Sequence, residues 1–263
     1  VFLSARNRAA KKEEEEEEDL VYCCSSSSTT PLLTALDRGD LELALFLVER
    51  GGERLANQRR RGDDATALHL AAHLGAATVV QGLLAQGADP NAIAAGYASP
   101  LCVAVASAAK RPSFRVTAVL LVDGGADPDA ACDFSSEEKE TRSHGGKTTP
   151  LLLAVDAGDD LLVRALLSNE TEAPGKAADP DRGLGTGSAQ SPLLYAVASG
   201  KSADVVRALL DAGANCAILV ASAQRRDLPP DNLLDIARHR RHYDVLQVLE
   251  AHRDDCDVKF EDM

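Results

Sequence analysis

Two histidines four residues apart are the first candidates for chemistry in this sequence. On a helix, His69 and His73 would lie on one face, the spacing at which two imidazoles can hold the same metal ion. The H-E-x-x-H arrangement that supplies a metalloprotease with its base is absent around them. We therefore expect no metal at this pair.

Three short motifs have the appearance of sites. Gly183–Ser188 carries alternating glycines like a phosphate-binding loop, but it lies in a Gly/Pro-rich stretch, whereas a nucleotide fingerprint follows a strand. Ser143–Gly146 is similar to an oxyanion loop, yet no G-x-S-x-G nucleophile motif exists. Asn169–Thr171 fits a glycosylation acceptor by chance composition. The sequence predicts neither a cofactor nor an enzyme.

Composition narrows the classes of partner. The 263 residues carry a formal charge of −13, which argues against nucleic acid or an anionic membrane surface as the main partner. A transmembrane helix needs about 20 apolar residues, and runs such as Leu101–Val105 fall far short. Aromatics make up only 3% and tryptophan is absent, so the core must consist of Leu, Val and Ala. Such small side chains suit closely packed helices.

The six cysteines do not form a recognisable site. No C-x-x-C pair is present, so structural zinc is not indicated. A chain of this length does not need a disulfide framework. We therefore expect reduced thiols and an intracellular, reducing compartment, with cytoplasm or nucleus favoured and an organelle left open.

One unit repeats six times along the chain. Its start is a Ser, Thr or Asn followed by Pro-Leu or a related apolar pair, with Ala five positions on. The starts are at residues 30, 66, 99, 149, 191 and 232, and a period of 33 residues with loop insertions explains their spacing.

Each part of the unit has a physical reason. Ser or Thr caps a helix and proline fits its first position. Glycine four residues after the alanine ends this short helix, at Gly39, Gly75, Gly158 and Gly200. A second helix follows, with an acid in its first turn at Asp40, Asp159, Asp204 and Asp244. A glycine-led turn such as Gly87–Asn91 comes next.

This pattern resembles the ankyrin-repeat family, whose unit carries T-P-L-H-x-A. Residues 66–92 match it well. The resemblance implies an all-α solenoid of stacked helix-turn-helix units with hairpin-like turns. It also implies that His69 bonds to neighbouring turns and that His73 projects toward the concave surface.

Three units depart from the pattern. In the fourth, Asn169-Glu170 replaces the glycine of the turn. The third has Ala108 where the helix-ending glycine belongs, followed by a longer connection through Lys110–Phe114. The sixth has Arg241 in that place and Glu250 where an apolar residue is expected. We interpret the sixth as a polar C-terminal cap that completes the array at this end.

We expect three segments: an acidic and Ser-rich arm at 1–29, six repeats at 30–253, and an acidic tail at 254–263. The run of glutamates in the arm is either a solvated face or a dock for a basic partner. The insertions 129–147 and 173–190 are either plain surface loops or partner contacts.

The family resemblance implies a non-catalytic module that binds another protein through its concave face and loop insertions, as an adaptor, a scaffold, an inhibitor or a subunit of a large multi-subunit complex. The alternative is an ankyrin regulatory domain of a larger enzyme or channel chain.

In this family the exposed positions are the two residues before the first helix's terminal glycine, together with those just before the cap. On this chain the predicted partner-binding residues are Asp37, Arg38, His73, Leu74, Tyr97, Ser107, Asp156, Ser199, His239 and Arg240. We expect Leu74 and Tyr97 to be apolar anchors of the interface.

Overall fold

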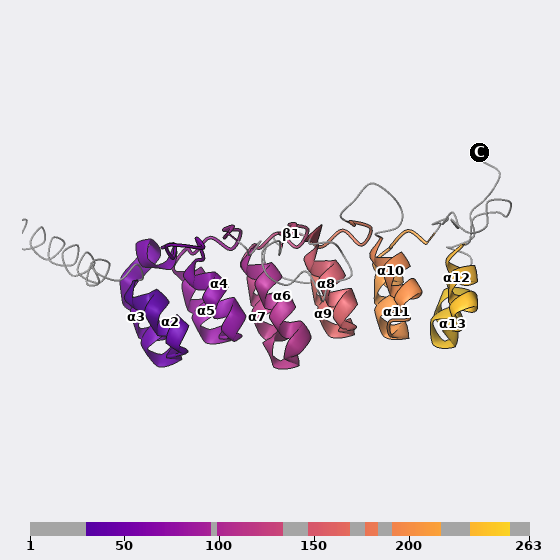
Figure 1. The fold of residues 1–263 in the computed structure, drawn as a ribbon, viewed down its shortest axis with the longest axis horizontal. Coiled ribbons are helices and arrows are strands. Elements are labelled where there is room, and N and C mark those ends of the chain that lie inside the picture. The colour runs from indigo at the N-terminus through magenta and orange to yellow at the C-terminus, as the bar shows by residue number, and fades with distance from the viewer. Residues whose placement is uncertain are drawn as a thin grey trace, which may run out of the picture. The chain divides into compact units, whose positions relative to one another are not determined.

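The computed structural model describes residues 30–95, 99–133, 147–168, 177–183, 191–216 and 232–252. The predicted arm at 1–29 and tail at 254–263 lie outside these residues. The chain divides into two compact units, the first ending at Ala126 and the second beginning at Asp127. Each unit is described by itself (Figure 1).

Three helix pairs make up the described part of the first unit. They are α2 (Pro31–Arg38) with α3 (Leu41–Ala56), α4 (Ala67–Leu74) with α5 (Ala77–Ala85), and α6 (Pro100–Lys110) with α7 (Arg115–Asp123). A 3-10 helix, η1 (Pro112–Phe114), joins the last two. Helix α4 contacts both α2 and α6, and α5 contacts both α3 and α7. The first helices thus form one layer and the second helices another.

The second unit repeats this arrangement. Its pairs are α8 (Pro150–Ala157) with α9 (Asp160–Leu167), α10 (Pro192–Ser199) with α11 (Ala203–Asp211), and α12 (Leu233–Arg240) with α13 (Tyr243–Ala251). Two short strands, β1 (Cys132–Asp133) and β2 (Lys147–Thr148), pair antiparallel with Cys132 opposite Thr148. This ladder brings together the two ends of the insertion that contains residues 134–146.

The first helices begin and end as their sequences require. The hydroxyl or amide oxygen of Thr30, Ser99, Thr149 and Asn232 accepts the N–H of the third helical residue, at 2.9–3.5 Å. Four first helices end at a glycine in the left-handed region, with φ between 64° and 72°: Gly39, Gly75, Gly158 and Gly200. Arg241 occupies this position in the last pair, with φ 63°.

The third pair differs for the reason that its sequence suggests. Because Ala108 replaces the terminal glycine, α6 continues to Lys110 and has 11 residues, where α2 and α4 have eight.

Two of the acids predicted in the first turn of the second helices lie one position earlier. Asp40 and Asp159 are the N-cap residues of α3 and α9, and each carboxylate accepts an amide hydrogen bond at 3.1 Å.

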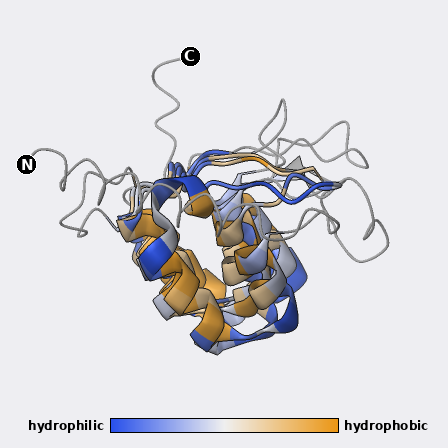
Figure 2. Ribbon diagram, turned by 90° about the vertical axis from the view of Figure 1, so that its left-hand side faces the viewer, coloured by the Kyte–Doolittle hydropathy of each residue, from blue (hydrophilic) through white to orange (hydrophobic). Residues whose placement is uncertain are grey.

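Leucine, valine and alanine fill the space between the two layers of each unit. Leu68 and Leu83 are fully buried in the first unit, and Leu193 and Leu209 in the second. The hydrophobic residues lie mainly on the helices, whereas the hydrophilic ones gather at the connections (Figure 2). Burial of these side chains is the main source of stability in such a stack.

Polar side chains link each turn to the next. Asn57 donates from Nδ2 to the carbonyl of Gly87 at 2.9 Å and accepts the Asp89 N–H at 2.8 Å. In the second unit, Asp129 accepts the Asp179 N–H at 2.9 Å, and Asp181 accepts the Asn215 N–H at 2.8 Å. These bonds hold successive turns in register, so the helix ends beside them are well positioned.

Candidate protein-interaction surface

The predicted site residues that the structure describes lie toward the C-terminal ends of the first helices. We call these ends, in each unit taken separately, the helix-end surface. The structure describes all the predicted residues except Tyr97, which lies outside the described ranges. The exposed ones are Asp37, Arg38, His73, Ser199, His239 and Arg240, and the half-buried ones are Leu74, Ser107 and Asp156. The expectation that Leu74 and Tyr97 anchor the interface therefore stays a prediction.

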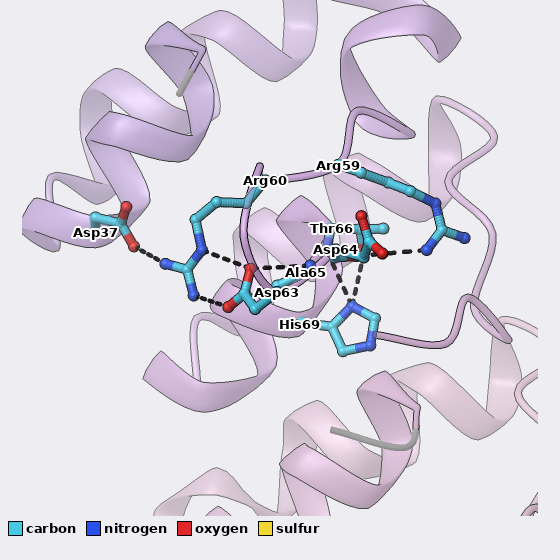
Figure 3. Close-up of polar contacts among 8 residues, drawn as sticks. All are labelled: Asp37, Arg59, Arg60, Asp63, Asp64, Ala65, Thr66 and His69. Carbon is cyan, nitrogen blue, oxygen red and sulfur yellow. Dashed lines mark hydrogen bonds and ion pairs between the residues drawn. The ribbon is translucent and has the colours of Figure 1, made fainter. Parts of the chain in front are cut away.

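An ion-pair network orders the first unit's helix-end surface (Figure 3). Arg60, in the connection after α3, donates to the Asp37 carboxylate of α2 at 2.7 Å. The same guanidinium donates to both carboxylate oxygens of Asp63. These hydrogen bonds lower the pKa of Asp63 below its ordinary value, so the carboxylate stays ionised. Arg60 therefore fixes the connection against α2 and neutralises part of the charge that Asp37 offers to a partner.

His69 bonds to Thr66, the residue at which this connection ends and α4 begins. Its Nδ1 accepts the backbone N–H of Thr66 at 3.2 Å and lies 2.9 Å from the Thr66 hydroxyl (Figure 3). The ring thus bonds to the cap of its own helix, which corrects the expectation of a bond to neighbouring turns. Burial, with a smaller effect of the Arg59 charge, lowers the pKa of His69 to about 4. A neutral ring is required, because Nδ1 must accept the amide proton.

His69 and His73 do not share an environment. The His69 side chain is buried, whereas His73 is exposed at the end of α4. Among the described residues, no group of three or more His, Cys, Asp or Glu side chains could hold a metal ion.

The connection after α6 shapes the same surface. The ring of Phe114 packs against Gly75, the C-cap of α4. The guanidinium of Arg111 lies 5.3 Å from the centre of the Phe114 ring. The long third connection therefore covers part of the C-terminal end of α4.

A different network orders the second unit's surface. The hydroxyl of Tyr195 on α10 donates to the carboxylate of Asp156 on α8. Lys201 donates to the carbonyl and, at 3.3 Å, to the carboxylate of the same residue. Asp156 is consequently engaged by the neighbouring repeat, so its charge is largely satisfied before any partner arrives.

The last two helix pairs are linked in the same way. Arg240 of α12 donates to the carbonyl of Ala198 at 2.9 Å. The ring of His242 packs against Gly200. Arg238, His239 and Arg241 are also exposed, and the two arginines give this end of α12 a positive charge.

The sequence did not reveal Arg60, Tyr195 and Lys201, which organise these surfaces. Each lies 23 to 45 residues from the group that it binds. No periodic pattern marks such a partner, although their positions beside a turn or a helix end are visible in the repeat.

Three cysteines correct the expectation of six reduced thiols. Cys102, Cys132 and Cys216 are disulfide-bonded. All three are buried, in the core or beside a turn. A disulfide does not require a C-x-x-C motif, so the absence of that motif from the sequence did not reveal this bonding.

The family comparisons agree with this architecture. The model described as ankyrin repeats in three copies matches residues 8–94, and the single ankyrin-repeat model matches residues 190–219. No curated protein matches the sequence.

Solved structures resemble the chain over most of its length. An ankyrin repeat domain from Acinetobacter baumannii AYE is 24% identical with a TM-score of 0.61, and the match covers 84% of this chain and 96% of that one. The ankyrin repeat protein EF0377 is 18% identical, with a TM-score of 0.58 over 84% of this chain and 96% of that one. The ankyrin repeat domain of Bcl-3, a member of the IkappaB protein family, is 26% identical, with a TM-score of 0.57 over 85% and 82%.

The chain is an ankyrin-repeat protein, and its fold is the predicted all-α helical repeat. Ankyrin repeats are generally protein–protein interaction modules without catalytic activity. No helix in the described ranges has the length and apolar character needed to cross a bilayer.

Proposed function

We propose that this chain is a non-catalytic adaptor or scaffold that binds another protein through its helix-end surfaces. The observation that carries the proposal is the set of contacts between repeats at these ends. Arg60 is bonded to Asp37, Lys201 and Tyr195 to Asp156, and Arg240 to Ala198. A surface held in this way loses little conformational entropy on binding.

Exposed side chains remain available beside these contacts. Arg38 and His73 end the adjacent helices α2 and α4 and are both exposed. Arg38 offers positive charge there, while the chain as a whole carries −13. A partner with complementary acidic and apolar groups fits this part of the first unit.

The perturbed titratable groups support a binding role over a catalytic one. In the described residues, the pKa shifts resolved are those of Asp63 and His69, and both groups are engaged in structural hydrogen bonds. Catalytic acids and bases are instead shifted where substrate can reach them.

Location in the cytoplasm or nucleus stays a prediction. The disulfide-bonded state of Cys102, Cys132 and Cys216 bears on it, because disulfides persist mainly in oxidising compartments. The count of free thiols described in the Discussion tests this point.

Affinity purification with quantitative mass spectrometry tests the proposed function. The full chain serves as bait beside two variants of equal size. Arg38→Ala/His73→Ala removes exposed groups of the helix-end surface, and Thr78→Ala/Gln81→Ala removes exposed groups of α5. We expect the first variant to lose a protein that the parent and the second variant retain. Identical sets of captured proteins for all three chains would overturn the proposed surface.

A further inference from the structure

Helix α3 exposes large apolar side chains at the edge of the first unit. Leu41, Leu43 and Phe46 have exposed fractions of 38%, 45% and 51%. Single exposed apolar residues are ordinary on a protein surface. Two of them that share one face of a helix form a patch that calls for a cover.

Two of these side chains lie on the side of α3 that faces away from α5. Leu45 and Val48 mark the side of α3 that faces α5. Their methyl groups lie 3.5 and 3.3 Å from the position that a Cβ would occupy on Gly82 of α5. At 100° per residue, Leu43, Phe46 and Arg50 fall on the opposite side of the helix. The guanidinium of Arg50 lies 5.1 Å from the centre of the Phe46 ring, so these residues share one face. We call Leu43, Phe46 and Arg50 the α3 stripe.

In a repeat stack, this side of a helix is where the preceding repeat packs. Helix α5 shows the rule, since it contacts α3 on one side and α7 on the other. A terminal repeat normally presents a polar face instead. Helix α13 presents Gln247 and Glu250 beside the exposed Tyr243, whose ring carries a hydroxyl, whereas α3 presents leucine and phenylalanine. The α3 stripe is therefore unlike a polar cap.

The family match indicates which part of the chain belongs there. The match to the model of ankyrin repeats begins at residue 8 and ends at residue 94, whereas the first unit with the repeat pattern starts at residue 30. The described helices in that range form two pairs, α2 with α3 and α4 with α5. Repeat-like sequence thus extends upstream of Thr30, where we predicted an arm separate from the array.

We propose that residues 8–29 form an incomplete repeat that packs on the α3 stripe. The segment contains the apolar residues Leu20, Val21 and Tyr22, and the acidic run Glu13–Glu18 is opposite in charge to Arg50. It joins α2 directly at Thr30, so its effective concentration at the stripe is on the order of millimolar, without any loss of association entropy. The inference concerns the stability of the array and does not depend on the proposed function.

Hydrogen exchange of the full chain, read by mass spectrometry, tests this packing. We expect backbone amides in residues 8–29 to be protected, and Phe46→Ser to lower that protection at least tenfold. Leu161→Ser is the matched control, because Leu161 is a similarly exposed residue of a second helix in the other unit. It should leave residues 8–29 unchanged.

Three results would contradict the proposal. Exchange of residues 8–29 at the rate of an unstructured peptide would show that nothing packs there. Protection that is insensitive to Phe46→Ser would place the segment elsewhere. A dimer in light scattering that Phe46→Ser converts to monomer would make a second copy of the chain the cover of the α3 stripe.

Discussion

The Phe114 ring lies so close to Gly75 that the glycine has no room for a side chain. A Cβ at this position would stand 2.3 Å from Cδ1 of the ring. Gly158 caps α8 with nearly the same backbone, φ 69° against 66°, but nothing lies within 4 Å of its Cβ position. A side chain at Gly158 would therefore add backbone strain alone, whereas a side chain at Gly75 would add the same strain and a clash with Phe114.

Gly158→Ala should lower the free energy of unfolding by about 1–2 kcal/mol, from left-handed strain alone. Gly75→Ala should lower it by about 1–3 kcal/mol more, because Phe114 must move. Urea denaturation of both variants measures the difference. Adding Phe114→Ala to Gly75→Ala should recover part of the loss. Equal costs at the two glycines would show that Phe114 does not pack on α4.

Arg241 is the one described C-cap of a first helix with a left-handed backbone and a side chain other than hydrogen, with φ 63°. Glycine adopts this conformation without strain. Arg241→Gly should therefore raise the free energy of unfolding by about 1 kcal/mol. Arg241→Ala removes the same charge but keeps the strain, so its stability should stay close to that of the parent. An equal gain in both variants would attribute the effect to charge.

Stability should fall as the pH drops from 7 toward 4, because of His69. Its pKa is about 4 in the folded chain and 6.5 as the ordinary value. Between these values the unfolded state binds more protons, so acid favours unfolding, and stability is fully present only above the unfolded pKa. The loss from this group should reach about 2 kcal/mol at pH 5.

Urea midpoints at pH 7 and pH 5 measure this effect. We expect His69→Asn to flatten the dependence and the exposed-residue control His73→Asn to keep it. A drop of the same size in His69→Asn would mean that other groups cause it.

The disulfide-bonded cysteines set a limit on reactive thiols. The chain has six cysteines, and Cys102, Cys132 and Cys216 are bonded. Because each disulfide joins two cysteines, at least four are bonded, which leaves at most two (6 − 4). Unfolding without reductant should expose no more than two groups to a thiol reagent, and reduction should raise the count to six. Three or more before reduction would restore the expectation of reduced thiols and a reducing compartment.

Local patterns predicted the elements of this fold well. The glycine at Gly39, Gly75, Gly158 and Gly200 ends its helix in the left-handed region, and the missing glycine at Ala108 lengthens α6. These features depend on residues within one turn of each other. The backbone physics is therefore visible in a short stretch of sequence.

Contacts between repeats were not predictable in the same way. The placement of Phe114 over Gly75 depends on the path of the connection after α6, and the bond from Arg60 to Asp37 depends on how α2 packs beside α4. Neither is encoded in a periodic pattern. For this reason the sequence predicted which residues stand at the helix ends but did not show that Asp37 and Asp156 are already engaged.

The affinity of the captured partner for variants of the helix-end surface tests the central claim most directly. Isothermal titration of the purified partner into the parent chain, Arg38→Ala/His73→Ala and Thr78→Ala/Gln81→Ala compares two pairs of exposed residues in the same unit. We predict that the helix-end pair weakens binding at least tenfold, or about 1.4 kcal/mol, while the α5 pair and the thermal stability of both variants stay unchanged. Equal affinity for all three chains, or a loss confined to the α5 pair, would contradict the account.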